Sequence, residues 1–291
     1  MRDILFVVGM GRSGTSALTR IVSLCGGVLP HRLLPPNFAN PSGYWEPERA
    51  VQINDSFLAS HGSSWYDGSL TLQSGLVGAG ERHAFVSEIA AFLRGEFDAG
   101  GPMVLKDPRI SALLPYWTAA ARELRLRVKV VHVFRDPGEV YASLAQRDGL
   151  TADHAFALWL KYNVIAERDA RAFPRVFVSY DDLMRDWEPL LSRCIERLGI
   201  DAVIDDAARS AVAAFLSPAL RHHNGTAAQP DEILPLLANA VAETHDLLKA
   251  AAAGTAPAAA FDAVGDAYAA TRSALEFRLT CSLRERPAAA A

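Results

Sequence analysis

The sequence predicts an α/β fold, in which a central parallel β-sheet is flanked by helices and followed by a helical C-terminal extension. Short apolar, β-branched runs alternate with segments in which apolar residues recur at helical spacing. This alternation is typical of a parallel sheet covered by helices. The chain has 291 residues, of which 50% are hydrophobic, so it can bury a large core in one domain, or in one domain with an appendage.

The first expected strand, residues 4–8, leads into a glycine-rich turn that opens directly into a helix. Such a turn presents backbone N–H groups and the positive end of a helix dipole to one point, which suits a phosphate. Gly9 and Gly14 have the Walker A spacing, but Thr15 stands where the Walker lysine would be, and the nearest cation is Arg12. The pattern indicates a P-loop-like central parallel β-sheet and weakens an ATPase or GTPase interpretation. The expected phosphate ligands are Gly11, Arg12, Ser13, Gly14, Thr15 and Ser16.

Three further strands are expected at residues 103–105, 128–134 and 176–179, with residues 28–29 as a short candidate fifth. Helical periodicity predicts helices over residues 84–97, 113–124, 139–146, 155–172 and 188–198. Residues 30–80 are rich in Pro, Gly, Asn, Ser and aromatic residues. We expect them to form a structured functional loop region without regular elements.

From about residue 231 the chain has the pattern of helices separated by an alanine-rich tract over residues 250–260. This pattern divides the chain into a ligand-binding domain, residues 1–228, and a helical extension, residues 229–291. The extension either packs on the same domain or serves oligomerisation, so a homodimer is one option that the sequence leaves open.

Composition limits the partners of the chain. A net charge of −4 and a pI of about 6.1 give no general attraction to nucleic acid or to an anionic membrane surface, so local Arg and Lys clusters must meet any anionic ligand. Cys25, Cys194 and Cys281 are odd in number and lack C-x-x-C spacing, which argues against a disulfide framework and a zinc site. No stretch has the length of a signal peptide or membrane span, so we expect a cytoplasmic protein.

Polar residues follow each expected strand. Lys106 and Arg109 come after residues 103–105, Arg135 comes after residues 128–134, and Tyr180 comes after residues 176–179. The carboxyl ends of parallel strands meet at one edge of a sheet, where ligands of such folds bind. The sequence therefore predicts a clamp for a ligand that carries phosphates at more than one position.

These motifs resemble those of sulfotransferases that use 3′-phosphoadenosine-5′-phosphosulfate (PAPS), in a bacterial-type version. The loop Arg12-Ser13-Gly14-Thr15-Ser16 is similar to their 5′-phosphosulfate loop, and Arg135 with Ser143 eight residues later is similar to their 3′-phosphate motif. The segment Tyr180-Asp181-Asp182-Leu183 is also similar, so that the resemblance covers roughly residues 4–200. It implies that residues 1–228 bind PAPS as co-substrate and release adenosine 3′,5′-bisphosphate, and that no metal is required.

The resemblance also implies roles for individual side chains. Arg12 would neutralise charge on the departing phosphate, and Lys106 would follow the transferring group; the alternative for Lys106 is a surface ion pair with Asp107. The histidine of the cytosolic relatives corresponds to Pro108, so another general base is needed. Glu46 ranks first, because other branches place a glutamate in this region, followed by His31 and then Asp107. The alternative for Glu46 is a carboxylate at a helix start.

Other polar residues have open interpretations. Arg135 either binds the 3′-phosphate or pairs with Asp136 or Glu139. Arg221 is a candidate for a basic loop over the nucleotide, whereas the adjacent His222-His223 pair does not favour a metal site. His132 is expected in the core, and Trp65-Tyr66-Asp67 either lines an acceptor pocket or packs its own loop.

The leading hypothesis is a sulfotransferase that moves a sulfuryl group in line from PAPS to an acceptor hydroxyl or amine. The acceptor would be a small molecule, a glycan or a lipid, with no nucleic acid as partner. The alternative is a P-loop nucleotide-dependent kinase or phosphotransferase, which needs Mg²⁺ and normally the Walker lysine. A third hypothesis is an inactive P-loop fold that acts as a binding or assembly module.

Overall fold

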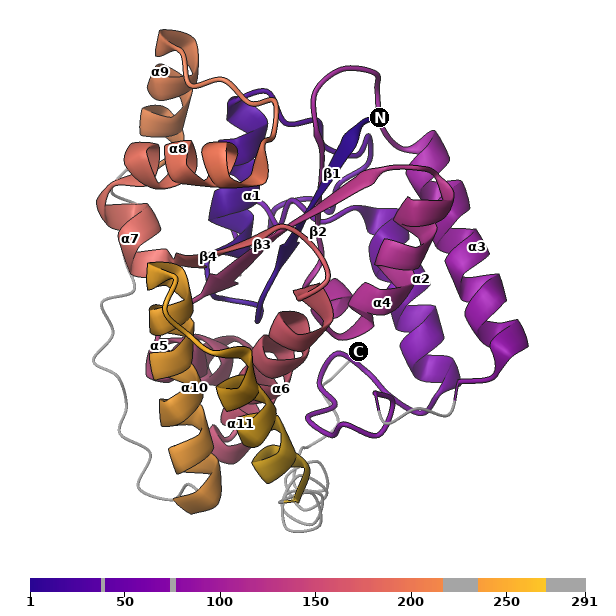
Figure 1. Cartoon of the computed structure of the whole chain (residues 1–291), viewed down its shortest axis with the longest axis vertical. Helices are drawn as coiled ribbons and strands as arrows, with labels where there is room; N and C mark the ends of the chain where they lie inside the picture. The colour runs from indigo at the N-terminus through magenta and orange to yellow at the C-terminus, as the bar shows by residue number, and fades with distance from the viewer. Residues whose placement is uncertain (38–39, 74–76, 217–234, 271–291) are drawn as a thin grey trace.

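The computed structural model describes residues 1–37, 40–73, 77–216 and 235–270 (Figure 1). Its centre is a parallel four-stranded sheet of order β2-β1-β3-β4. The strands are β1 (Asp3–Val8), β2 (Met103–Lys106), β3 (Arg127–Phe134) and β4 (Arg175–Ser179). All four predicted strands are thus present, and the predicted fold class of a parallel sheet flanked by helices is confirmed. Val28 pairs with Met103 only as an isolated bridge, so the candidate fifth strand is a single contact.

Helices cover both faces of this sheet. Those of the first half are α1 (Thr15–Leu24), α2 (Glu48–Ser60), α3 (Ala79–Gly95), α4 (Pro108–Glu123) and α5 (Pro137–Asp148). Next along the chain come α6 (Ala152–Ala170), α7 (Tyr180–Arg185), α8 (Trp187–Leu198) and α9 (Asp206–Phe215). The C-terminal pair is α10 (Pro235–Ala253) and α11 (Ala258–Ala270).

Side chains of β1 alternate between two cores. Ile4, Phe6 and Val8 pack with α2, α3 and α4, whereas Leu5 and Val7 pack with α1, α8 and α9. Because both faces are covered, the strand is apolar at nearly every position, as a central parallel strand should be. This burial fixes the carboxyl end of the sheet, from which the polar loops project.

The expectation of no regular element between residues 30 and 80 is wrong, because α2 lies in this region. Its buried residues fall at helical spacing: Ala50, Ile53, Asn54, Phe57 and Leu58. The polar Asn54 interrupts the apolar pattern but is fully buried, since it hydrogen-bonds Trp117 and Asp107. The segments before and after α2 are rich in Pro, Gly, Asn and Ser, and they made its helical periodicity hard to recognise in the sequence.

Several helices begin earlier than their apolar periodicity predicts. α4 starts at Pro108 rather than residue 113, because Asp107 accepts a hydrogen bond from the backbone N–H of Arg109 and proline suits the first helical turn. α5 starts in the same way at Pro137, where Asp136 accepts from the N–H of Glu139. Caps, rather than core positions, set these two boundaries.

The C-terminal helices α10 and α11 stand beside α6 (Figure 1). Leu237, Val241 and Leu248 of α10 and Phe261 and Val264 of α11 join the same buried cluster as the apolar residues of α5 and α6. The extension therefore adds to the core of the domain.

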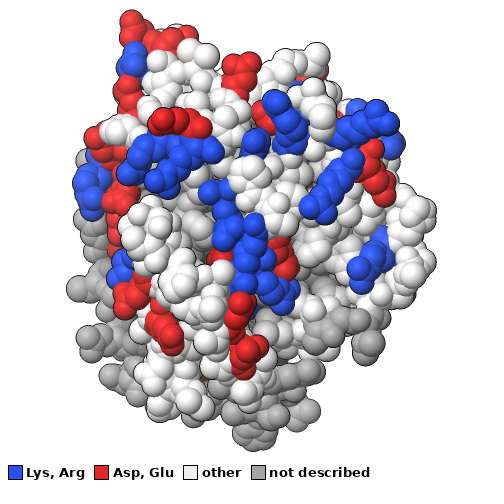
Figure 2. All heavy atoms as spheres, viewed as in Figure 1, with Lys and Arg blue, Asp and Glu red and all other residues white. Residues whose placement is uncertain are grey.

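Figure 2 shows Lys and Arg interspersed with Asp and Glu on the face in view, without a broad area of one sign. Within the described ranges, no helix combines the length and apolar character needed to cross a membrane.

Candidate active site

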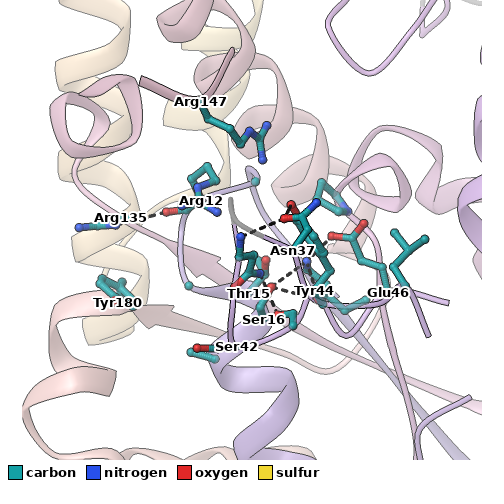
Figure 3. A pocket seen from close by; sticks show the side chains of 18 of the residues that line it. Arg12, Thr15, Ser16, Asn37, Ser42, Tyr44, Glu46, Arg135, Arg147 and Tyr180 are labelled. Atoms are coloured by element: carbon teal, nitrogen blue, oxygen red, sulfur yellow. Dashed lines mark hydrogen bonds and ion pairs between the residues drawn. The ribbon is translucent and has the colours of Figure 1, made fainter. Parts of the chain in front are cut away.

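A cavity of about 640 Å³ opens at the carboxyl edge of the sheet. The glycine loop after β1, the end of β2, and the residues that follow β3 and β4 all contribute to its lining. In Figure 3, Arg12 and Arg135 lie on one side, Asn37, Tyr44 and Glu46 lie on the other, and Arg147 lies above them. The cavity therefore brings together most of the residues that the sequence singled out.

The glycine loop is closely packed. A Cβ on Gly9 would lie 2.0 Å from the carbonyl oxygen of Val133, and a Cβ on Gly14 would lie 2.2 Å from the ring of Tyr180. Both glycines also have positive φ angles, of 128° and 89°. These two contacts explain why the loop needs glycine at both positions, and they hold the loop against β3 and the start of α7.

The polar atoms of the loop face the start of α1. The N-cap of this helix is Gly14, which has no side chain and so makes no side-chain capping hydrogen bond to the first N–H groups. The Ser13 side chain is fully buried, and its hydroxyl has no hydrogen-bond partner among the described residues. A buried hydroxyl beside an uncapped helix start is a donor set that suits an anion.

Arg12 and Ser143 meet directly. The Nε–H of Arg12 donates to the Ser143 hydroxyl at 2.8 Å, although the two residues are 131 positions apart. Burial lowers the pKa of the Arg12 guanidinium, and the neighbouring Arg147 lowers it further, but arginine stays charged in proteins. The structure thus places a fixed positive charge in the loop, three residues before Thr15, which occupies the Walker lysine position.

Arg135 lies beside the same loop. Its guanidinium packs 4.5 Å from the ring centre of Tyr180, and its Nη1 is 3.5 Å from the backbone oxygen of Arg12. Its Nε donates to Glu139 at 2.5 Å, so the predicted alternative of a Glu139 pair is formed. This ion pair leaves Arg135 lining the cavity, and Glu139 orients it.

Lys106 is the last residue of β2 and lies 3% exposed in the floor of the cavity. Its Nζ donates to Glu46 at 2.5 Å, to the Ser16 hydroxyl at 3.0 Å and to the Tyr44 carbonyl at 3.2 Å. The expected alternative for Lys106, a surface pair with Asp107, is therefore wrong. The lysine instead connects the glycine loop with the segment that carries Glu46.

Glu46 is 6% exposed and precedes α2. Burial raises the pKa of its carboxyl, while the ammonium of Lys106 and, more weakly, Arg109 at 3.9 Å oppose that rise. A carboxylate in this setting is a stronger base than an exposed glutamate. Glu46 thus combines access to the cavity with the properties of a proton acceptor.

The other two base candidates lie differently. Asp107 is fully buried and is held by Asn54 at 2.8 Å and by Arg109 at 2.9 Å, so it caps and braces α4. His31 is bound to Asp98 at 3.1 Å, its side chain is 45% exposed, and it does not line the cavity. Arg221 and the His222-His223 pair lie outside the described residues.

Sequence reasoning missed several lining residues, among them Asn37, Tyr44, Arg147, Asp148 and Phe215. Arg147 could have been found, because it lies one helical turn after Ser143 on the same face of α5. Asn37 and Tyr44 carry no comparable signal, since they reach the cavity from an irregular segment. His132 is in the core as expected, with its Nε2 2.8 Å from Asn163.

No family model matches the chain, and the search of curated proteins gave no match. Among solved structures, the sulfotransferase domain of the Synechococcus PCC 7002 olefin synthase is similar at 18% identity and a TM-score of 0.46, covering 84% of this chain and 96% of that one. Sulfotransferase STF9 from Mycobacterium avium is similar at 14% identity and a TM-score of 0.47, covering 77% and 69%. Mouse sulfotransferase SULT7A1, complexed with PAP, is similar at 12% identity and a TM-score of 0.41, covering 81% and 71%. All three are described as sulfotransferases, the family that the motifs of this chain resemble.

Proposed function

We propose that this chain transfers a sulfuryl group from PAPS to an acceptor hydroxyl or amine. The observation that carries the proposal is the meeting of two sets of residues in one cavity. Arg12 and Arg135 line the cavity at the glycine loop, with Ser143 bound to Arg12, and the buried pair of Lys106 and Glu46 lines the same cavity. The first set suits phosphate groups, and the second suits proton removal from an acceptor.

The residues present fit a nucleotide with two phosphate positions. The start of α1 would hold the 5′ group, with the cavity-lining residues Gly14, Thr15 and Ser16 of the loop. Arg135 and Ser143 would hold the 3′-phosphate, with Tyr180 packed against the guanidinium of Arg135. When bound, PAPS supplies the sulfuryl group and the phosphate that departs from it.

Side chains of the chain itself would remove the proton from the acceptor and stabilise the developing charge. Glu46 accepts the proton of the acceptor hydroxyl or amine, and burial raises the pKa of its carboxyl, which makes the carboxylate a stronger base. Lys106, whose Nζ binds Glu46 and Ser16, would supply positive charge to stabilise the negative charge that develops on the group in transfer. Arg12 neutralises the phosphate side, and its bond to Ser143 holds it there.

The experiment that tests the proposal measures nucleotide selectivity. We expect adenosine 3′,5′-bisphosphate to bind about ten- to a hundred-fold more tightly than AMP, because a lost charged hydrogen bond costs about 1.5–3 kcal/mol. Calorimetry should show that Arg135→Ala loses most of this preference. Arg49→Ala is the matched control, since Arg49 is a half-exposed arginine paired with Glu88 outside the cavity. Equal affinity for the two nucleotides in the unaltered chain would defeat the proposal.

A second prediction concerns divalent metal. Activity should survive excess EDTA, because Arg12, Lys106 and Arg135 place at the cavity the positive charge that Mg²⁺ supplies in kinases. Rates of labelled sulfuryl transfer with and without the chelator test this directly. Turnover that disappears with EDTA and returns with Mg²⁺ would instead favour the phosphotransferase alternative.

A further inference from the structure

Four consecutive backbone carbonyls, those of residues 65–68, each accept a hydrogen bond from a buried side chain of another element. The donors are Tyr162 to Trp65 at 2.9 Å, His154 to Tyr66 at 2.6 Å, Lys161 to Asp67 at 2.6 Å, and Tyr268 to Gly68. Three of these donors come from α6 and the fourth comes from α11. An irregular segment usually satisfies its carbonyls with water, so this arrangement fixes the segment in place.

The four side chains that donate these hydrogen bonds are buried. All four side chains belong to residues no more than 4% exposed, and one of them is a lysine. Burial lowers the pKa of Lys161 to about 8, because Asp67, whose carboxylate is 3.8 Å away, recovers only part of the lost hydration. A buried ammonium is retained only where its hydrogen bonds are satisfied, and here the main partner is the carbonyl of Asp67.

The fixed segment carries one wall of the cavity. Trp65 and Tyr66 both line it, and the ring of Trp65 stands 4.0 Å from the place that a Cβ on Gly11 would occupy. The guanidinium of Arg147 packs 5.3 Å from the ring centre of Trp65. Trp65 and Tyr66, with Arg147 and Asp148 at the end of α5, thus form a mixed aromatic and charged wall beside the glycine loop.

Helix α11 is placed so that Tyr268 can reach this wall. A Cβ on Gly265 would lie 3.2 Å from Val164, so glycine allows a close approach of α11 to α6. Arg171, after the end of α6, binds Asp262 of α11 at 2.7 Å. The hydroxyl of Tyr268 then lies between the carbonyls of Gly68 and Ala157, the latter at 3.1 Å.

We propose that α6 and the C-terminal helix α11 set the acceptor-binding wall, and that Lys161 and Tyr268 are positioning residues that act through Trp65 and Tyr66. This inference rests on the proposed function, since it assigns the side of Arg135 and Tyr180 to the nucleotide and the side of Trp65 to the acceptor. Helix α11 then controls acceptor binding through Tyr268, although none of its described residues lines the cavity. An acceptor on this wall meets two aromatic rings beside an arginine and an aspartate.

The test compares Tyr268→Phe, which removes one hydroxyl, with Lys161→Met, which reaches the same segment from α6. Tyr116→Phe is the matched control, because Tyr116 packs with Phe57 and Phe85 in a different core cluster. Hydrogen exchange of amides 65–69 reports on the segment, and calorimetry with adenosine 3′,5′-bisphosphate reports on the nucleotide side. Initial rates with labelled PAPS and a panel of a phenol, a sugar and a long-chain alcohol report on the acceptor.

Both variants should speed exchange over residues 65–69 by about threefold to tenfold, as expected for one lost buried hydrogen bond. The acceptor KM should rise by a similar factor, while kcat and bisphosphate affinity stay within about twofold of the unaltered chain. Faster exchange with an unchanged acceptor KM, or an equal loss of acceptor and nucleotide binding, would overturn the assignment of the wall. Failure of the unaltered chain to bind the bisphosphate would instead overturn the proposed function.

Discussion

Replacing Glu46 by glutamine is expected to lower kcat by about 10²–10⁴ while leaving the affinity for adenosine 3′,5′-bisphosphate nearly unchanged. Glutamine keeps the shape of the side chain and much of its hydrogen bonding, but it cannot accept a proton. The carboxylate lies in the cavity, and burial raises its pKa, so that the substitution removes a base rather than a binding group. Transfer rates with labelled PAPS, together with calorimetry, separate the two quantities.

The contact between Glu46 and Lys106 complicates this substitution, because loss of one partner of a buried ion pair is destabilising. Thermal unfolding of the variant must therefore be measured beside its activity. Glu48→Gln is the matched control, since Glu48 begins α2 two residues later and does not line the cavity. If Glu46→Gln folded and retained a near-normal kcat, Glu46 would be a structural partner of Lys106, and the base would have to be sought elsewhere.

The assignment of Glu46 as the general base also predicts the direction in which kcat changes with pH. A general base works only when ionised, so kcat falls as the pH drops through the pKa of Glu46. Because burial raises that pKa, the fall should begin at a higher pH than for an ordinary glutamate. This acidic limb should vanish from the pH profile of Glu46→Gln, whose residual rate no longer depends on that group.

Local sequence patterns were sufficient to predict the part of the site that lies at the carboxyl edge of the sheet. The strands are continuous apolar runs, and the glycine loop, Arg135 and Ser143 occur at fixed spacings on elements that the pattern identifies. The parallel topology then brings the residues after each strand to one edge, as Lys106 and Arg135 show.

Contacts between distant segments could not be predicted in this way. The bond between Lys106 and Glu46 joins residues 60 positions apart, and that between Tyr268 and Gly68 joins residues 200 positions apart. Neither pair has a local periodicity, because each joins elements that only the tertiary structure brings together. The irregular segment before α2 also lacks a repeating pattern, although Tyr44 and Glu46 place its polar groups in the cavity.

The second large effect is expected at Arg12, the cation inside the glycine loop. Arg12→Gln should lower kcat/KM by about 10²–10³, because removal of one group that stabilises developing charge costs roughly that much. Arg12 has a φ of 70°, and glutamine meets the same backbone strain as arginine at this position. We therefore expect the loop to keep the same conformation in the variant and in the unaltered chain. The measured difference then reports the loss of the guanidinium charge.

Ser143→Ala tests the position of the Arg12 guanidinium, whereas Arg12→Gln tests its charge. The serine hydroxyl accepts from Nε of Arg12 at 2.8 Å, so the alanine variant keeps the guanidinium, loosens its position and also removes the hydroxyl proposed for the 3′-phosphate. We expect a loss of about tenfold in kcat/KM for Ser143→Ala, as for one hydrogen bond to a charged group, and a much larger loss for Arg12→Gln. A loss for Arg12→Gln confined to KM, with kcat unchanged, would mean that Arg12 only binds the nucleotide. A larger loss for Arg12→Gln, concentrated in kcat, is the result required of a charge that acts on the departing phosphate while the bond to it breaks.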